Sequence, residues 1–484
     1  MKPLLHFPWM EAMMIAPLIG SWLQRQKSQL AARRKLALIS SGLTLILALG
    51  AWIDFSLLDV PQAHDLWPLL SMLLGQEWLI VDALSSPLLP LAALIHFLVI
   101  LMTPPTKRRR FPYGLVLIME TLVLLLFACR LPEGILLLMA LSAIPPWMDL
   151  KARGHATGLF WMHTLTSLSL MVGGWLLMES DPKGGPLGPV LLMMGLLIRA
   201  GSVPFHLWVA DLFENASFGV AILHVTPMAS AYAAIRLILP DAPDLLMDLL
   251  GVLALVTALY SAGMALVQQE ARRFFCFLFL SHSSLVWLGL EVISPLGWTA
   301  GLCVWISVSL CMAGFGLTLR AVESRVGYLD WKHYRGLYRH MPMLAIFFLL
   351  SGLACIGFPG SIGFIGMEML VESALNAYPH VGVMVLLAAA LNGIAVLTVY
   401  FRIFTGSIHP GSISLAAMPQ EKWAVGILGI LIIGVGLAPQ SGVNSRYQAA
   451  MELLTPASND TWIPSHDQPS GILGSLSDGL NPNH

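Results

Sequence analysis

The sequence places one arginine, Arg199, inside a long apolar run that extends from Val190 to Val203. A guanidinium keeps its charge near neutral pH, because its pKa exceeds ~12. A permanent cation near the centre of a membrane helix costs at least ~2.5–3.5 kcal/mol on insertion scales, so water, a carboxylate or a polar cavity must lie close to it. Arg199 therefore predicts an ion or proton path through a membrane.

Four further ionisable residues in apolar surroundings are candidates for carrying protons along such a path. They are His206, His224, His282 and Glu368. Histidine titrates near neutral pH and can pass a proton on, whereas arginine releases one poorly. A buried histidine is also often a hydrogen-bonded packing residue, and a buried arginine can serve to hold two helices together. Each candidate therefore has a structural interpretation beside the functional one.

Proline and glycine predict interruptions in two of the membrane helices. Pro204 removes a backbone hydrogen bond just past Arg199, and it would break the helix there. The run from Gly357 to Gly366 holds four glycines and one proline, and we expect the second break at Pro359 and Gly360. Broken helices are tolerated at membrane depth where they line a cavity. We expect Glu368 or Glu372 to face such a polar space.

The composition is that of a polytopic helical membrane protein. The 484 residues are 57% hydrophobic and only 11% charged, with a mean hydropathy of +0.77, whereas soluble domains carry roughly 25% charged residues. Apolar runs predict about fourteen transmembrane helices, with neither a cleavable signal peptide nor a soluble catalytic domain. The five cysteines are scattered through apolar runs, so they predict no metal site and no disulfide framework.

The positive charges predict the orientation. Twenty of the 26 Lys and Arg fall in loops after odd-numbered predicted helices, and four fall in loops on the opposite side. By the positive-inside rule, both termini then face the periplasmic side of the cell inner (plasma) membrane. The longest internal loop on the cytoplasmic side is expected at about residues 320–340, which is too short for a catalytic domain.

Several motifs, in the right order, resemble those of antiporter-like membrane subunits. Arg199–Asp211 resembles the signature K-x-x-x-x-P-F-H-x-W-L-P-D, with arginine in place of lysine. Similar matches follow at Ser217–Arg236, Glu270–His282, Tyr334–Pro342 and Gly357–Gly366. This family occurs in respiratory complex I (NADH-quinone oxidoreductase), Mrp-type cation/proton antiporters, energy-converting hydrogenases and DAB-type carbon uptake systems. The resemblance covers about residues 80–410.

The resemblance implies an all-α fold with two inverted five-helix repeats, in which helices 7 and 12 are broken. The expected divisions are an N-terminal three-helix region (1–110), a first repeat with helices 4–8 (111–240), a second repeat with helices 9–13 (241–405), a C-terminal helix 14 (406–450) and a polar tail (451–484).

The chain departs from the family pattern at the charged positions that form the family's proton row. Arg199 stands at the position of the seventh-helix lysine. The fifth-helix glutamate aligns at about Ala140, and the eighth-helix lysine aligns at Pro227 or Met228. A later histidine and lysine align near Val308 and Met312, and the twelfth-helix glutamate aligns at Met367. A titratable row is thus largely replaced by apolar groups. The polar groups that remain are Arg199, His206, His224, His282 and Glu368.

These features favour a proton-translocating, or degenerate, membrane subunit of a multi-subunit complex such as NADH:quinone oxidoreductase or a membrane-bound hydrogenase. Two alternatives stay open: a proton-coupled membrane subunit of a DAB-type inorganic-carbon uptake complex, and a non-conducting scaffold. We expect no catalytic group and no cofactor in the chain itself. The expected partners are other membrane subunits, a soluble or peripheral cytoplasmic subunit and the lipid bilayer, and no nucleic acid.

Overall fold

The computed structural model describes residues 3–67, 69–74, 77–180, 185–327, 329–331, 334–407 and 415–455. Most of the predicted polar tail, from residue 456 onward, lies outside the described residues, as do Lys183 and Lys332 of the charge count. The description below concerns the compact unit Met1–Leu454.

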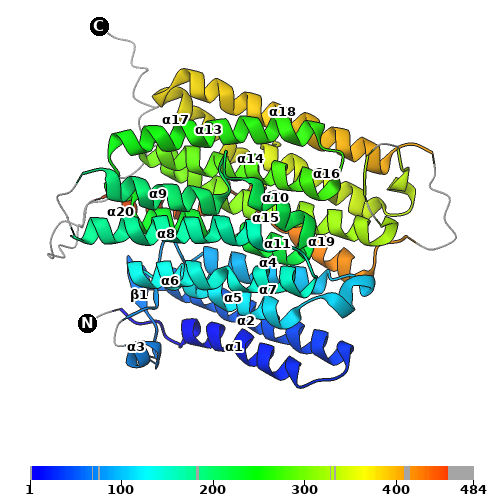
Figure 1. Ribbon diagram of the computed structural model, residues 1–484, viewed down its shortest axis with the longest axis horizontal. Helices are drawn as coiled ribbons and strands as arrows, with labels where there is room; N and C mark the ends of the chain where they lie inside the picture. Colours follow the sequence, from blue (N-terminus) through cyan, green and yellow to red (C-terminus); the bar gives the residue numbers. More distant parts are fainter. Residues whose placement is uncertain are drawn as a thin grey trace, which may run out of the picture. The chain divides into compact units, whose positions relative to one another are not determined.

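The described chain is almost entirely helical, as predicted (Figure 1). The first half contains α1 (Trp9–Arg25), α2 (Leu30–Leu58), α3 (Leu69–Leu74), α4 (Leu88–Leu101), η1 (Pro105–Arg110), α5 (Tyr113–Ala128), α6 (Pro132–Ser142), α7 (Ile144–Ala152), α8 (Gly158–Ser180), α9 (Leu187–Ala200), α10 (Leu207–Asn215), α11 (Phe218–Val225), α12 (Ala229–Leu237) and η2 (Leu239–Asp241). The second half contains α13 (Asp244–Val267), α14 (Ala271–Glu291), α15 (Pro295–Val326), η3 (Leu337–Arg339), α16 (Pro342–Ile356), α17 (Ile362–Ala377), α18 (Pro379–Phe404), α19 (Pro419–Leu437) and α20 (Gln440–Leu454).

Two short strands are the exception to the helical pattern. β1 (Gln62–His64) and β2 (Ile80–Asp82) pair antiparallel, with Ala63 opposite Val81. They join the segment after α2 to the segment before α4, and their buried residues pack into the hydrophobic core.

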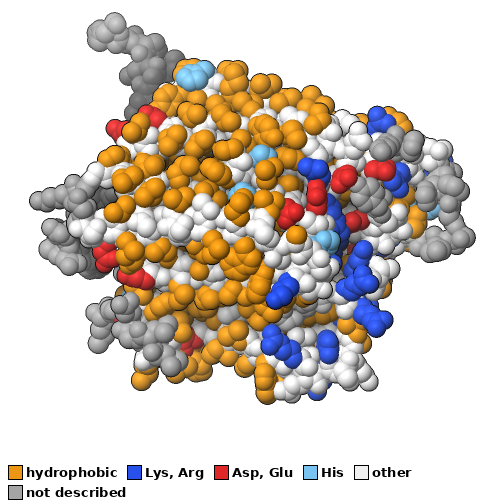
Figure 2. All heavy atoms as spheres, viewed as in Figure 1, with side chains coloured by type: hydrophobic (Ala, Val, Ile, Leu, Met, Phe, Trp, Pro, Cys, Tyr) orange, Lys and Arg blue, Asp and Glu red, His pale blue; other side chains and the backbone are white. Residues whose placement is uncertain are grey.

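The outer surface of the bundle is apolar over a broad area. Eight described helical stretches are long and apolar enough to cross a membrane, and four shorter apolar helices accompany them. Large hydrophobic side chains such as Ile46, Val252 and Ile394 are more than half exposed. Figure 2 shows such side chains covering much of one face, with Lys and Arg gathered toward one end. This surface suits lipid, so the chain is a multi-pass membrane protein, while the number fourteen stays a prediction.

Small residues bring the helices close together around Arg199. α8 and α9 lie side by side (Figure 1), and a Cβ added at Gly174 of α8 would lie 2.5 Å from the Leu192 nitrogen of α9. The Ser167 hydroxyl donates to the Gly195 carbonyl at 2.7 Å. Close backbone approach and interhelical hydrogen bonds hold helices together in lipid, because lipid tails are as apolar as the helices and no hydrophobic effect drives the helices to associate. This seam fixes the position of α9.

The predicted break at Pro204 is present, and the structure supplies partners for the freed backbone groups. Gly201 adopts φ +78° and ends α9, with the Ser202 N–H donating to the Leu197 carbonyl at 3.0 Å. The Val203 N–H donates to the Thr257 hydroxyl of α13 at 3.0 Å. The Trp208 indole donates to the Ile198 carbonyl at 2.9 Å. These three backbone groups at the break are each satisfied by a neighbour, as burial demands.

The second predicted break lies between α16 and α17, but it is shorter than expected. Gly357 adopts φ +93° and the Phe358 N–H donates to the Leu353 carbonyl at 3.1 Å, so α16 and α9 end in the same way. α17 begins at Ile362, immediately after Pro359 and Gly360. Gly363 is therefore helical and does not unwind the chain. Because it has no side chain, its backbone can lie against the Ala354 carbonyl.

A third interruption was not predicted. α11 ends at Val225 and α12 begins at Ala229, with Met228 at φ +54° between them. Two side chains of α15 donate to the carbonyls that the interruption frees from the helix. The Ser309 hydroxyl donates to the Thr226 carbonyl at 2.8 Å, and the Trp305 indole donates to the Pro227 carbonyl at 3.2 Å. The predicted eighth helix is thus divided at membrane depth.

Two predicted boundaries need correction. α15 continues through Val326, so Arg320 lies within a helix and is buried, rather than at the start of a loop. The region assigned to one C-terminal helix contains both α19 and α20, and α20 continues past the predicted end at residue 450 to Leu454.

Candidate functional site

Arg199 and His224 form the centre of the candidate site. Arg199 occupies the last turn of α9, and only 9% of it is exposed. His224 occupies the last turn of α11, and its Nδ1 atom lies 3.4 Å from Nη2 of Arg199. A guanidinium can only donate, so Nδ1 accepts and the imidazole proton of His224 lies on Nε2 in this contact. A second proton, on Nδ1, would make His224 a cation beside the Arg199 cation. Protonation of His224 therefore requires the contact to open.

Arg199 has no carboxylate to neutralise it. Among the described residues, no Asp or Glu oxygen lies within 4.0 Å of its guanidinium, and its Nε atom has no hydrogen-bond partner. The Trp208 ring lies 5.5 Å from the guanidinium carbon, a cation–π contact that contributes about 2 kcal/mol when desolvated. This is no more than the insertion cost of the charge. The Arg199 guanidinium therefore needs further polar partners.

Two small cavities adjoin the guanidinium. Each has a volume of about 20 Å³, and both are lined by Arg199, His224 and Ala229. Because a water molecule needs at least ~10–15 Å³ of such space, each cavity has room for one. The first cavity also touches Ser283 of α14, and the second touches Ser142 of α6. Water at these positions would give Arg199 the polar contact that the protein does not.

Polar side chains of α14 continue from the first cavity toward the second half of the chain. Ser283 lines the cavity, and Ser281, two residues earlier, donates to the Ala258 carbonyl of α13 at 2.8 Å. The Asn392 amide of α18 donates to the Ser281 hydroxyl at 2.8 Å. His282 lies between the two serines in sequence and is fully buried, and among the described residues neither of its ring nitrogens has a hydrogen-bond partner. We refer to Arg199, His224, Ser283, Ser281 and Asn392 as the central row.

His206 does not join this row. It precedes α10, and its ring lies 5.2 Å from the ring of Tyr260 and 5.8 Å from that of Phe277, measured between centroids. Its Nδ1 atom is buried without a hydrogen-bond partner. The break thus places Arg199 and His206 in different surroundings: the arginine beside α11, and the histidine among aromatic rings of α13 and α14.

Glu368 does not face a polar space between the helices. It is exposed on α17, whereas Met367 before it is buried. Glu372, one turn later, is exposed as well. The expectation fails because Gly363 and Gly366 are helical, so the carboxylates follow the register of a regular helix and turn outward. Four of the five predicted polar groups are buried, and only Arg199 and His224 contact each other.

Comparisons with known proteins agree with this architecture. The family described as "NADH:quinone oxidoreductase/Mrp antiporter, TM" matches residues 157–392, which include all three interruptions and the whole central row. Residues 157–392 carry the membrane domain of this family of antiporter-like subunits. The subunit is similar over most of its length to NAD(P)H-quinone oxidoreductase chain 4 of Prochlorococcus marinus (strain NATL2A), with 27% identity over 491 residues that cover 91% of this chain and 90% of the relative.

Two further similarities extend the comparison. The subunit is 24% identical over 269 residues to NADH-quinone oxidoreductase subunit N of Hydrogenovibrio crunogenus, a match that covers 54% of this chain but only 56% of that relative's length. A chain in the structure of respiratory complex I from Thermus thermophilus with bound NADH superposes with a TM-score of 0.78 at 24% identity, and covers 92% of this chain and 100% of that one. This likeness shows the shared fold.

The residues that sequence reasoning missed in this subunit are uncharged. Ser283 and Ser281 gave only a weak signal in one sequence, because serine is common in membrane helices and often bonds to carbonyls within its own turn. The one available sign was the run Ser281–Ser284, which brings three hydroxyl groups to the level of a buried histidine. Asn392 carries no such sign, since its importance depends on the packing of α18 against α14.

Proposed function

We propose that this antiporter-like subunit moves protons across the cytoplasmic membrane as part of a multi-subunit complex of the NADH:quinone oxidoreductase type. The observation that carries the proposal is the buried Arg199 guanidinium, which has no carboxylate within 4.0 Å among the described residues and adjoins two water-sized cavities. A purely structural arginine buried among membrane helices needs polar partners, such as the carboxylate that Asp82 gives Arg236 or the Ala83 and Leu84 carbonyls that accept from Arg446. Among the described residues, Arg199 has only the long contact with His224.

The mechanism follows from the contact between Arg199 and His224. While the contact is closed, Nδ1 of His224 accepts from the guanidinium and cannot take a proton. When the two side chains separate, His224 accepts a proton, and closing the contact again expels it toward the cavity that Ser283 lines. Ser281 and Asn392, both in the second half of the chain, then hold water that takes the proton onward from Ser283. Arg199 supplies a fixed charge and carries no proton itself.

The proposal includes the surroundings of the subunit. The basic end of the bundle faces the cytoplasm, both termini face the periplasm, and the apolar outer surface meets lipid and other membrane subunits. Electrons and quinone are handled by partner subunits, including a peripheral one on the cytoplasmic side. The relatives reported above are quinone oxidoreductase subunits, so carbon uptake is the less favoured alternative.

A non-conducting scaffold is the second candidate, and one observation favours it. His282 has no hydrogen-bond partner on either ring nitrogen, and Val308 and Met312 of α15, which replace titratable residues of the family pattern, are buried and apolar. A proton that passes His282 finds no titratable group at these positions of α15.

The two candidates separate in a transport assay. The native complex is purified, reconstituted into lipid vesicles and energised by its own electron donor, and proton movement is followed with a pH-sensitive dye. We expect Arg199→Ala to lower the transport rate by about tenfold or more, equivalent to at least ~1.4 kcal/mol in activation free energy. Glu368→Gln, a charge removal on the outer surface, is the control and keeps the wild-type rate. Unchanged transport by an intact Arg199→Ala complex supports the scaffold.

A further inference from the structure

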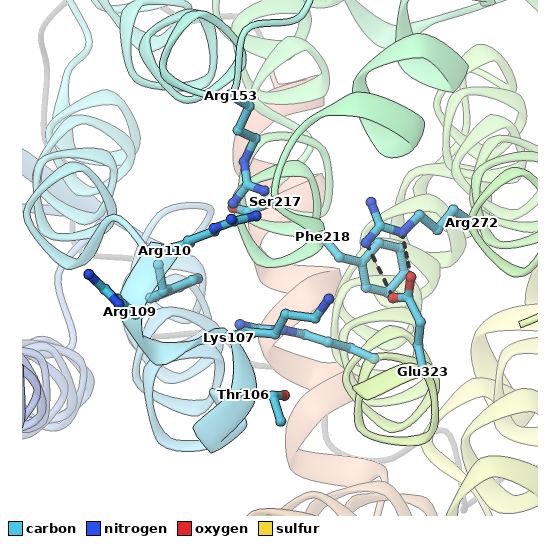
Figure 3. Close-up of a pocket in the computed structure, with 11 residues that line it drawn as sticks. Thr106, Lys107, Arg109, Arg110, Arg153, Ser217, Phe218, Arg272 and Glu323 are labelled. Carbon is cyan, nitrogen blue, oxygen red and sulfur yellow. Dashed lines mark hydrogen bonds and ion pairs between the residues drawn. The ribbon is translucent and has the colours of Figure 1, made fainter. Parts of the chain in front are cut away.

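A large basic pocket opens at the end of the bundle where Lys and Arg gather. Its volume is about 720 Å³. Its lining includes six cationic side chains and a single carboxylate, Glu323; the cations are Lys107, Arg109, Arg110, Arg153, Arg272 and Arg320. The contributing elements are η1, the loop after α7, the junction of α10 with α11, and the facing ends of α14 and α15 (Figure 3). Segments far apart in sequence thus build one cationic cavity.

Most of the cations in this pocket have no acidic partner. Glu323 is occupied by Arg272, with Nε 2.9 Å from Oε1, and Arg153 is paired with Asp149 at 3.0 Å. Lys107, Arg109, Arg110 and Arg320 have no carboxylate within 4.0 Å in the part of the chain that the structure describes. Figure 3 shows the side chains of Arg110 and Arg153 pointing toward one another. Like charges so arranged repel unless an anion lies between them.

Two buried polar groups in the lining have unused hydrogen-bonding capacity. Arg320 is only 5% exposed and lies over the Phe111 ring, 4.9 Å from its centroid. Among the described residues it donates to two acceptors, the Val99 carbonyl at 3.4 Å and the Thr103 hydroxyl at 3.3 Å. A guanidinium has five donors, so further donors remain. The Ser217 hydroxyl is buried and has no hydrogen-bond partner in the described part of the chain. A buried cation and a buried hydroxyl, both short of partners, mark a site built for an acceptor-rich anion.

We propose that this pocket binds a phosphate group. A guanidinium can donate two parallel N–H hydrogen bonds to two oxygens of one phosphate, and it stays charged at every physiological pH. Basic pockets at the cytoplasmic ends of membrane helices suit the head groups of anionic lipids, and free inorganic phosphate offers the same chemistry. Phe111 and Phe218 in the lining place apolar rings beside the charges, which suits the acyl chains that adjoin a lipid head group. The site stands apart from the central row and does not depend on proton transport.

The test compares two double variants of the full chain in its native complex. Lys107→Gln with Arg110→Gln removes two exposed pocket cations and leaves the buried Arg320 in place. Arg25→Gln with Lys27→Gln removes two exposed cations from the α1–α2 connection, outside the pocket, and is the control. Binding is measured for inorganic phosphate by calorimetry, and for nanodiscs of phosphatidylglycerol against phosphatidylcholine by native mass spectrometry of retained lipid.

The expected result is at least tenfold weaker binding by the pocket variant and no more than a twofold change in the control. Loss with phosphatidylglycerol alone identifies a lipid head group as the ligand, and loss in both arms identifies the phosphate group by itself. Equal binding by the wild type and the pocket variant in both arms overturns the proposal. Absence of binding in both arms by the wild-type complex also overturns it, and leaves the cations to an acidic protein partner.

Discussion

Asn392 of α18 donates from Nδ2 to the Ser281 hydroxyl of α14 at 2.8 Å, while its own Oδ1 atom is buried without a hydrogen-bond partner in the described chain. An unsatisfied buried acceptor lowers stability, so this amide is a poor choice for structure alone. It joins α14 to α18, both in the second half of the chain, next to His282 in the sequence of α14. We attribute its presence to the central row.

Asn392→Leu separates the structural from the functional interpretation of this amide. Leucine has a similar shape and leaves no unsatisfied oxygen, so the unfolding midpoint of the complex should stay within about 2 °C of the wild type or rise. Proton transport in vesicles should fall by about fivefold or more, because water loses its link between α14 and α18. A variant that is as stable as the wild type and transports equally well would remove Asn392 from the path.

Two glycine substitutions test the geometry of the break beside Arg199. Gly201 has φ +78°, and a Cβ there would lie 2.6 Å from Cγ2 of Val209. Gly201→Ala should therefore cost about 1–3 kcal/mol in the free energy of unfolding. Gly263, within α13, has open space around it, and Gly263→Ala should gain about 0.5–1 kcal/mol. Unfolding midpoints in one detergent compare the two, and equal shifts would argue against this geometry.

The ion pair of Asp82 with Arg236 should be essential for stability. Burial raises the pKa of Asp82, but the adjacent Arg236 outweighs this effect and holds that pKa at about 2. Because the folded pKa lies below the unfolded one, the ion pair stabilises at all pH values above ~4 and weakens as the pH falls toward 2. Asp82→Asn at pH 7 leaves Arg236 buried without its carboxylate, which should cost about 3–5 kcal/mol.

Arg130→Gln is the matched control for that substitution. Arg130 also approaches Asp82, at 4.0 Å, but its side chain is 39% exposed. Exposed pairs contribute about 0–1 kcal/mol, so the unfolding midpoint should change little. Both variants are compared by thermal unfolding, and similar losses would contradict the importance assigned to burial.

The stability of the β1–α3 segment should depend on pH through Asp65. Burial raises the pKa of Asp65 to about 6, although N–H groups of Glu11 and Leu66 donate to its carboxylate and oppose the shift. Because the folded pKa exceeds the unfolded value of ~3.9, stability is greatest below pH ~4 and declines as the pH rises through 6. Asp65→Asn should remove this decline. Unfolding midpoints at pH 5 and 7 measure it, and an unchanged difference between the two would refute the assignment.

Much of the fold could be predicted from the sequence, because proline, glycine and charge act locally. Pro204 and Gly357–Gly360 lie at real interruptions, and Arg199 is buried beside one of them. The break at Met228 escaped prediction, since Pro227 is the only sign in the sequence and its carbonyl is satisfied by the distant Trp305. Arg320 was assigned to a loop because the end of α15 carries charges, yet packing against α4 keeps it helical and buried.

The candidate site was harder to predict than the fold. Ionisable residues identified Arg199 and His224, but Glu368 was misplaced because one residue of helical register decides whether a side chain points inward or outward. The serines and Asn392 became visible only when α13, α14 and α18 were brought together. Contacts between remote segments carry this information, and no local pattern encodes them.

The most direct test of the central claim is a charge replacement at position 199. Arg199→Gln and Arg199→Lys are introduced into the native complex, and proton transport in vesicles is normalised to the amount of assembled complex. If a fixed charge beside His224 drives the proton step, Arg199→Gln lowers transport by about tenfold or more, and Arg199→Lys restores it to within about threefold of the wild type. Equal transport by the wild type and Arg199→Gln, with assembly intact, would contradict the account.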